Sequence, residues 1–387
     1  MQVLKTVCLL VLMMTHTTTS SLVTEGNLVV QSSNNFSNNV YMHLIKSGGN
    51  VLYCPISAHV LLSLVYLGAK GKTAHEMKIA LQIKYSDKVL KNSYKKILNG
   101  IHHSTLNIVI RIYSKIGVKV KPDFISTSQN YFASYFQEVD FTKRKETAQL
   151  INTFVQDQTK DTIKDFVKAD SLHNALNMIL VNAAHFKSDW IFSFSKAVEG
   201  DFYVSKTQKV IVEMMNTGKT CDFKSSSTLN SKLVRIHFKN LSYSMIIVLP
   251  NKIDGLCEVE LKLQNQINEI FHGYSTRVVN ISIPKFKIET EINLLSVLKY
   301  LGMKLLFSTE ANLSGLLYDP TLVDRVLQKT YIDVNEYGVD VAASTLISVE
   351  FYSGIFEQET FVADHPFLFF ITFENLIIFQ GRFVKPN

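Results

Sequence analysis

The stretch EYGVDVAAST, residues 336–345, says most about how this 387-residue chain folds. It contains no proline, and after its glycine the residues alternate with period two. Val339, Val341 and Ala343 fall on one side, whereas Asp340 falls on the other. One apolar and one more polar side is the pattern of a strand with a single buried face.

The same stretch runs on into FYSG, residues 351–354, and a mixed segment that ends near Gln358. That composition is typical of an exposed, protease-accessible loop. A segment suited both to a loop tip and to a sheet interior is a candidate conformational switch. On these residues alone, an ordinary edge strand followed by a turn is the simpler interpretation, so both remain open.

The composition indicates a folded protein with a sizeable core. Hydrophobic residues make up 47% of the chain and charged residues 19%, which argues against global disorder. The body contains no run of about 18 apolar residues, the length that would predict a membrane span. We therefore expect one compact domain over residues 21–387, a monomer that binds neither membrane nor nucleic acid.

The first twenty residues have the pattern of a secretory signal. Lys5 supplies a positive charge, residues 7–14 are apolar, and residues 17–21 are small and hydroxylated. We therefore predict a signal peptide over residues 1–20 and a secreted, extracellular product.

Cysteines and sequons fit this expectation. Loss of the signal leaves Cys54, Cys221 and Cys257, too few for a disulfide framework. Cys54 lies in an apolar run and is predicted to be a buried thiol, while the sequence leaves a Cys221–Cys257 pair open. Four Asn-X-Ser sequons predict glycosylation at Asn35, Asn240, Asn280 and Asn312. We expect Asn35 first, and poorer glycan access at Asn280 because it lies in an apolar, strand-like run.

Helical patterns come first along the chain and strand patterns later. Helices are predicted over residues 27–45, 55–67, 145–157 and 294–301, and TAHE at 73–76 has the form of a capping box that opens a further helix. Strands are predicted over residues 178–186, 232–238, 245–249, 278–283, 367–373 and 376–379. This order predicts an α+β protein.

No catalytic or metal-binding motif is present. The chain contains no Gly-x-Ser-x-Gly, His-Glu-x-x-His or Cys-x-x-Cys sequence and no phosphate-binding glycine loop. We expect no enzyme activity, no cofactor and no metal. Lys84, Lys88, Lys91 and Lys95 are spaced to lie on one face of a helix, which could bind a sulfated polysaccharide or could be an ordinary solvated face.

Several motifs, taken in order, resemble the serpins, a family of protease inhibitors. They are NVLYCPIS (50–57), LGAKGKT (67–73), LVNAAHFKSDW (180–190), IPKF (283–286), FVADHPFLF (361–369) and FQGR (379–382). The match covers nearly the whole chain after residue 20. It implies about eight or nine helices around three β-sheets, with an exposed reactive-centre loop at about 336–358.

For that loop the resemblance implies a mechanism. A protease cleaves the loop and becomes an acyl-enzyme, and the freed segment then enters the main sheet as a central strand. The hinge residues are Glu336, Gly338, Val339, Val341, Ala342, Ala343, Ser344 and Thr345. Residues 338–352 contain no proline, as a central strand requires, and the inward side is apolar or small.

Counting from Glu336 as the family does places the reactive bond at Tyr352–Ser353, or at Phe351–Tyr352 if the register differs by one. An aromatic residue there predicts a chymotrypsin-like serine protease as target. A cathepsin-G-like enzyme or a cysteine protease is an alternative.

The resemblance also assigns a sheet-opening region and departs from the family within it. The residues are Cys54, Ser57, Asn182 and Gln328, and Trp190 is the family's breach tryptophan. Members usually carry serine at the position of Cys54 and histidine at that of Gln328. We therefore expect an altered barrier to sheet opening. Val339 and Val341 replace smaller hinge residues, which affects the rate of insertion.

The sequence thus predicts a secreted, irreversible inhibitor of a chymotrypsin-like protease. The alternative is a non-inhibitory serpin that acts as a carrier, storage or binding protein. The hinges of such members tend to contain charges or proline. In this hinge the one charged residue of the strand pattern is Asp340, on the outward side.

Overall fold

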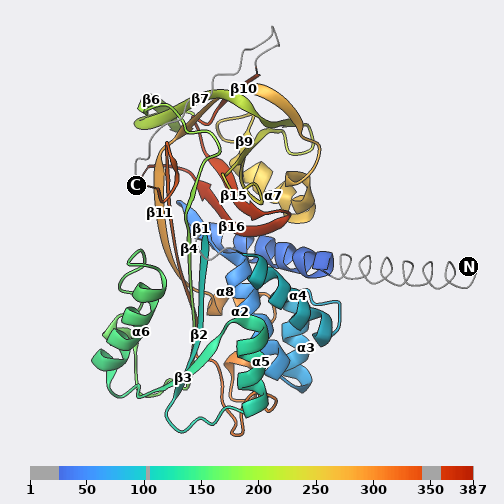
Figure 1. Cartoon of the computed structure of the whole chain (residues 1–387), viewed down its shortest axis with the longest axis vertical. Coiled ribbons are helices and arrows are strands. Elements are labelled where there is room, and N and C mark those ends of the chain that lie inside the picture. Colours follow the sequence, from blue (N-terminus) through green and yellow to red (C-terminus); the bar gives the residue numbers. More distant parts are fainter. Residues whose placement is uncertain (1–25, 102–104, 342–358, 387) are drawn as a thin grey trace, which may run out of the picture.

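The computed structural model describes residues 26–101, 105–341 and 359–386. Helices and two large sheets make up these residues, so the predicted α+β class is confirmed. Figure 1 shows α6 on one side of the long strands β2 and β4, and α2 and α5 on the other side. Residues 26–44 form a helix that lies across the molecule beneath α7.

The helices predicted at 27–45, 55–67, 145–157 and 294–301 are confirmed to within one residue at each end, whereas the helices at 122–132 and 256–266 were not predicted. Beside 26–44 the helices are α2 (Pro55–Gly68), α3 (Gly71–Ala80), α4 (Asp87–Gly100), α5 (Pro122–Phe132), α6 (Arg144–Gln158), α7 (Leu256–Gln266) and α8 (Leu295–Tyr300). Short 3-10 turns are η1 (Ile45–Ser47), η2 (Ala169–Ser171), η3 (Ile267–Ile270) and η4 (Leu305–Phe307). Pro55 begins α2, where its missing N–H has no helical partner to lose.

The predicted capping box at 73–76 is wrong. α3 begins two residues earlier, at Gly71, with Lys70 as its N-cap residue. The side chains of Thr73 and Glu76 instead accept hydrogen bonds from distant backbone amides. Thr73 Oγ1 accepts from Asn312 N at 3.0 Å, and the Glu76 carboxylate accepts from the amides of Lys304 and Leu305 at 2.8 Å. The Thr73 hydroxyl and the Glu76 carboxylate, which a local cap would use, thus bind backbone amides that are distant in the sequence.

The seven-stranded sheet holds the candidate site. Its order is β3 (Tyr135–Val139), β2 (Leu106–Lys115), β4 (Met178–Phe186), β12 (Arg325–Asn335), β13 (Gly338–Val339) and β5 (Ser188–Asp189), and β11 (Phe286–Asn293) also pairs with β12. The strand predicted at 178–186 is confirmed to the residue.

The second sheet has nine strands. Its order is β1 (Val51–Tyr53), β16 (Leu376–Phe383), β15 (Phe367–Phe373), β9 (Tyr243–Pro250), β8 (Ser231–His237), β7 (Gln208–Ser226), β10 (Ser275–Pro284) and β14 (Glu359–Val362), and β6 (Val198–Ser205) pairs with β7. Three sheets were expected, but the described strands form two. The 19-residue β7 pairs with β6 over residues 208–214, with β10 over 214–223 and with β8 over 222–226, and so joins two groups of strands.

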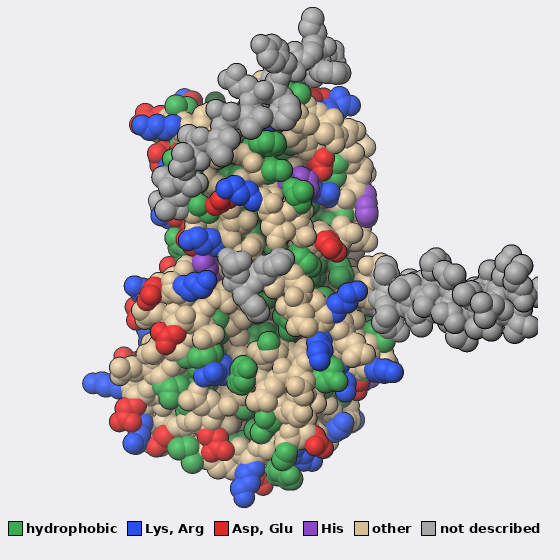
Figure 2. All heavy atoms as spheres, in the orientation of Figure 1, with side chains coloured by type: hydrophobic (Ala, Val, Ile, Leu, Met, Phe, Trp, Pro, Cys, Tyr) green, Lys and Arg blue, Asp and Glu red, His purple; other side chains and the backbone are tan. Residues whose placement is uncertain are grey.

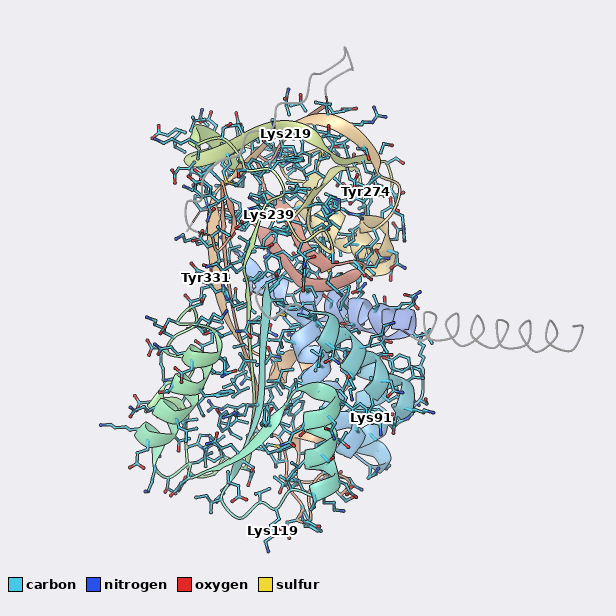
Figure 3. All side chains as sticks on the ribbon, in the orientation of Figure 1. Lys91, Lys119, Lys219, Lys239, Tyr274 and Tyr331 are labelled. Atoms are coloured by element: carbon cyan, nitrogen blue, oxygen red, sulfur yellow. The ribbon has the colours of Figure 1, made fainter. Side chains whose placement is uncertain are left out.

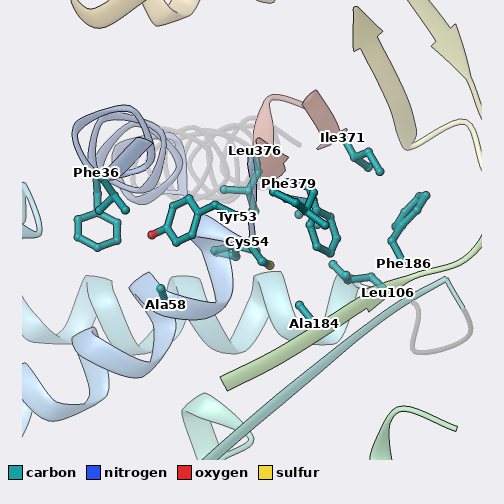
Figure 4. Packing of buried hydrophobic residues seen from close by; sticks show 14 of the residues in the cluster. Phe36, Tyr53, Cys54, Ala58, Leu106, Ala184, Phe186, Ile371, Leu376 and Phe379 are labelled. Atoms are coloured by element: carbon teal, nitrogen blue, oxygen red, sulfur yellow. The ribbon is translucent and has the colours of Figure 1, made fainter. Parts of the chain in front are cut away.

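The main core lies where α2 meets both sheets. α2 is buried along nearly its whole length because it packs against β4 on one side and β16 on another. Phe186 of β4 makes an edge contact with Phe379 of β16, with ring centroids 6.4 Å apart (Figure 4). Separate clusters fill the space beneath α6 and beneath α7. None of the described helices is both long and apolar enough to cross a bilayer.

Candidate functional site

The candidate site is the junction of β4 and β12 in the middle of the seven-stranded sheet. These strands pair directly and in parallel, from Ile179 opposite Arg325 to His185 opposite Tyr331. β2 pairs with the other edge of β4, and β11 with the other edge of β12. Neighbouring strands lie about 4.8 Å apart, so a further strand can join the centre only if this one ladder separates.

Beyond that ladder, the first hinge residues already lie within the sheet. β12 turns back at Glu336, and Gly338 and Val339 pair with Asn335 and Val334 of β12. On their other edge the same two residues pair with β5, which continues the line of β4. β13 is antiparallel to both neighbours, so a longer β13 would run between β4 and β12.

Close packing requires the glycine at this point. A Cβ atom on Gly338 would collide with the Ser188 carbonyl oxygen and lie 2.7 Å from the Cα atom of Asp189. Val339 is fully buried, as expected for an inward-facing position. The start of the predicted hinge is therefore closely packed between β5 and β12.

The β13 ladder ends at Asp340 because the backbone turns there. Asp340 has φ of +53°, the left-handed region that Asp tolerates better than most residues. Its carboxylate lies 2.8 Å from Nε2 of His185, on β4, and its amide donates to the Asp333 carbonyl oxygen at 2.7 Å. Growth of β13 would require Asp340 to leave both the left-handed conformation and His185.

Glu336 fastens the turn that precedes the hinge. Its carboxylate accepts a hydrogen bond from Ala197 N at 3.1 Å and lies 3.4 Å from Lys285 Nζ, and its carbonyl oxygen accepts from Phe194 N. Burial alone would raise the pKa of Glu336, but the backbone amides of Glu336 and Ala197 and the Lys285 ammonium together hold that pKa below its usual value. The carboxylate is therefore charged at neutral pH.

Trp190 lies against the same turn. Its indole Nε1 donates to the Asn335 carbonyl oxygen at 2.9 Å, and its backbone amide donates to Tyr337. The ring stacks on Phe238 with centroids 4.6 Å apart and planes 10° from parallel. The sequence predicted a packing residue here, and the indole also holds the β12–β13 turn.

The four predicted sheet-opening residues meet in one buried hydrogen-bond network. The Gln328 amide nitrogen donates to the Cys54 carbonyl oxygen at 2.9 Å, to Ser57 Oγ at 3.2 Å and to Asn182 Oδ1 at 3.3 Å. Its amide oxygen accepts from Cys54 N at 3.0 Å. Ser57 Oγ donates to Asn182 Oδ1 at 2.7 Å.

This network connects the two strands that would have to separate. Gln328 of β12 and Asn182 of β4 are opposite each other in the parallel ladder, and both reach the first turn of α2. Asn182 Nδ2 is buried and makes no hydrogen bond within the described part of the chain. An unpaired buried donor costs about 1–3 kcal/mol, so the closed junction retains one unfavourable, unpaired hydrogen-bond donor.

Cys54 stands where family members usually carry serine, and here it is a buried, unreactive thiol. The thiol is fully buried at the N-cap position of α2, and burial raises its pKa to about 12. The thiol is therefore protonated and unreactive while the junction is closed. Cys221 and Cys257 are both free, so the pairing that the sequence left open does not form.

Several predicted site residues lie outside the described ranges. These are the hinge residues Ala342, Ala343, Ser344 and Thr345 and the reactive-bond candidates Phe351, Tyr352 and Ser353. The structure therefore describes the predicted loop only at its two ends, residues 336–341 before it and β14 after it.

The sequon residues lie in different settings. Asn35 is half-buried on helix 26–44, Asn240 accepts a hydrogen bond from Ser242 N, and Asn312 is exposed. Asn280 is exposed on β10, so the expectation of poor access was wrong. Alternation along β10 turns its side chain outward between the buried Val279 and Ile281.

The lysine face is smaller than the sequence suggested. Lys84 lies before the helix, because Ser86 caps α4 through a hydrogen bond to its Oγ from Val89 N. Lys91, which is labelled in Figure 3, and Lys95 place their ammonium groups 5.5 and 5.4 Å from the Tyr131 ring centroid. Lys91 also lines a hollow with Asp87 and Asp123. Figure 2 shows basic and acidic side chains mixed over the visible face.

The sequence did not reveal the pairing of His185 with Asp340, or of Lys285 with Glu336. His185 is the one titratable side chain in the strand 178–186, and that contrast is the signal that marks it. Nothing local marks Lys285. Among the described residues, no group of three His, Cys, Asp or Glu side chains could hold a metal ion.

Replacing Gln328 with leucine should weaken the junction. The change keeps the volume but leaves the buried Cys54 N–H without its acceptor, at about 1–3 kcal/mol, and removes the Gln328 hydrogen bonds to the Cys54 carbonyl oxygen and to Asn182 Oδ1. We expect an earlier first transition in urea unfolding. Gln208→Leu, an exposed site on the β6–β7 hairpin, is the matched control. Equal transitions for the two variants would contradict the assignment.

Thiol labelling should distinguish the described cysteines. Cys257 is exposed, whereas burial raises the pKa of Cys54 to about 12 and that of the half-buried Cys221 also to about 12. With iodoacetamide at pH 8, peptide mass spectrometry should find Cys257 modified quickly and Cys54 modified only after denaturation. Equal rates at Cys54 and Cys257 would mean that the junction stands open in the resting protein.

Comparison with known proteins agrees with this geometry. The family model described as "Serpin (serine protease inhibitor)" matches residues 31–386. Antichymotrypsin-2 of Bombyx mori is 31% identical over 92% of this chain and 98% of its own length, and alaserpin of Manduca sexta is 31% identical over 92% and 93%. The crystal structure of Serpin48 from Tenebrio molitor superposes with a TM-score of 0.87 at 31% identity, covering 93% of this chain and 99% of that one. The chain therefore belongs to the serpin (serine protease inhibitor) family.

Proposed function

We propose that this protein is an irreversible inhibitor of a chymotrypsin-like serine protease and acts by inserting its cleaved loop between β4 and β12. The observation that carries the proposal is the position of β13. Gly338 and Val339 already occupy the gap between β12 and β5, antiparallel to both. The residues that follow them would extend that strand directly into the junction.

The energetics favour this direction of change. The resting junction is a parallel ladder, and parallel pairing is slightly less stable per residue than antiparallel pairing. Insertion would replace it with two antiparallel ladders, one to β4 and one to β12. The route crosses the Gln328 network and the contact between His185 and Asp340, which hold the resting state kinetically rather than at its free-energy minimum.

The chemistry follows from the proposed reactive bond. The protease serine attacks the Tyr352 carbonyl carbon, the Tyr352–Ser353 bond breaks, and the new Ser353 amine leaves with the proton from the protease histidine. Tyr352 is then an ester on the protease. About 13 residues from Asp340 to Tyr352, at about 3.3 Å each, would carry that ester about 43 Å along the sheet before water hydrolyses it.

Further parts of the proposal rest on the sequence. The aromatic residue at 352 supports a chymotrypsin-like target, as does the name of the relative antichymotrypsin-2. The pattern of residues 1–20 supports secretion of a single-domain, monomeric product spanning 21–387. The face formed by Lys88, Lys91 and Lys95 is the place to test for a sulfated polysaccharide. We propose no catalytic activity.

A protease panel tests the target and the bond. Incubation with chymotrypsin should yield an adduct that survives boiling in SDS and a released C-terminal peptide that begins at Ser353. Trypsin should give little adduct, because its specificity pocket selects basic residues. Preferential adducts with trypsin, or a peptide that begins at Gly354, would overturn the assignment. A carrier or storage protein would form no adduct with any protease.

Val341→Arg tests loop insertion. Val341 is only half-buried in the resting protein, so arginine is accommodated there, but the inserted strand would turn residue 341 to the same buried side as Val339. The variant should be cleaved as a substrate, lose the adduct and gain no heat resistance after cleavage. Val362→Arg, at a 38%-exposed position beyond the loop, is the control and should keep the adduct. Normal adduct formation by Val341→Arg would exclude this insertion path.

A further inference from the structure

A groove lined by carboxamide side chains lies between helix 26–44 and the end of α7, and none of the four network residues lines it. It has a volume of about 390 Å³, and eight of its nine lining residues are asparagine or glutamine. One wall is helix 26–44 and the other is the end of α7 with η3, which Figure 1 shows close above that helix. The volume falls in the range of small-molecule sites, about 300–1,000 Å³.

The helical wall presents its amides in a row. Gln31, Asn35 and Asn39 are spaced by four residues, so they lie along one face of helix 26–44. The adjacent Phe36 and Val40 are fully buried and hold the helix against the core. No hydrogen bond within the described part of the chain occupies the side-chain amides of Asn35 and Asn39, so both are available to a ligand.

The other wall is held in place by hydrogen bonds. The Asn38 amide donates to the Leu263 carbonyl oxygen at 2.9 Å, which fixes α7 to helix 26–44. Gln264 and Gln266 follow at the end of α7, and Ile267 forms an apolar floor that is 5% exposed. Gln82 closes one end, its carbonyl oxygen accepting from Ser32 Oγ at 2.7 Å. The groove is therefore formed before any ligand arrives.

The chemistry of this lining selects an uncharged, hydroxyl-rich ligand. A carboxamide offers two donors and one acceptor with two lone pairs, and it does not titrate in the physiological range. None of the nine lining residues bears a charge, so the groove lacks the cations that bind phosphate or sulfate and the carboxylates that bind metal ions. Sugar hydroxyl and acetamido groups both donate and accept hydrogen bonds, so they can pair with the NH₂ donors and with the oxygen acceptors of such amides.

The position of Asn35 provides a second, independent observation. It lines the groove and is also the first residue of the sequon Asn35-Phe36-Ser37. Ser37 is fully buried and its hydroxyl donates to the Gln380 amide oxygen at 2.6 Å, so the sequon is accessible only before the chain folds. A sugar attached to Asn35 during synthesis would therefore begin inside the groove.

We infer that this groove is a binding site for a neutral saccharide of the N-acetylglucosamine class. Two sources share that chemistry: the first sugars of a glycan on Asn35 itself, and a saccharide from another molecule. The site is separate from β4, β12 and β13, so its occupation does not depend on the proposed inhibition of a protease.

The test uses the full chain from two hosts. The bacterial product carries no glycan, and N,N′-diacetylchitobiose is added to it as the probe. Hydrogen exchange of residues 264–268 and titration by NMR should detect binding. Asn39→Leu and Gln264→Leu should each weaken binding about three- to tenfold, the range for one lost hydrogen bond. The matched control Gln208→Leu, outside the groove, should leave it unchanged.

The second preparation is secreted from a eukaryotic host. If the source is the chain's own glycan, peptide mapping will find Asn35 occupied, and enzymatic removal of the glycan will speed exchange at residues 264–268. In that case only the bacterial product will bind added N,N′-diacetylchitobiose, because the glycan already fills the groove of the other. If the source is another molecule, Asn35 will be unoccupied and both preparations will bind the added saccharide.

The inference is overturned if neither preparation shows binding or protection. It is also overturned if the groove variants bind chitobiose as well as the control does. Protease adducts, measured on the same samples, report on the other site and should be unaffected by Asn39→Leu and Gln264→Leu.

Discussion

The parallel ladder between β4 and β12 is the constraint on which the rest of this structure depends. It is a direct pairing at the centre of a seven-stranded sheet, and both strands are largely buried. Gln328 and Asn182 lie opposite each other within it and share hydrogen bonds with the first turn of α2. The helix that carries much of the core is thereby coupled to the junction at which we propose that the sheet opens.

The hinge residues define the direction in which a strand could enter this junction. The two residues of β13 pair with β12 on one edge and with β5, which continues the line of β4, on the other. The strand ends at Asp340, whose backbone adopts the left-handed conformation and whose carboxylate contacts His185. Glu336 and Trp190 fix the turn that feeds β13. Under the proposed insertion, each residue added to β13 would gain backbone partners on both edges, once Asp340 has left His185 and the Gln328 network has separated.

Sequence patterns predicted several regular elements well but missed the long strands β2, β7 and β12, and they predicted local details less well. β4 and β15 have the predicted limits, since an uninterrupted apolar run leaves little choice of boundary. Thr73 and Glu76 matched a helix cap but serve Asn312 and Lys304, residues more than two hundred positions away. Asn280 lies in an apolar run yet faces water, because alternation in β10 outweighs average hydropathy. In the candidate site, the resemblance to serpins identified the network residues but not the hydrogen bonds that they make; these residues are Cys54, Ser57, Asn182 and Gln328.

The sequence by itself determined the α+β class, the limits of β4 and β15, and a hinge without proline whose alternate residues are apolar. These properties depend on neighbours in the chain, on side-chain periodicity and on backbone N–H groups, which can be read directly. Only the tertiary structure decided that Gly338 and Val339 are already paired, that His185 meets Asp340, and that carboxamides from helix 26–44 and α7 share one groove. Each of these joins residues far apart in the chain, and packing of the whole core sets such distances.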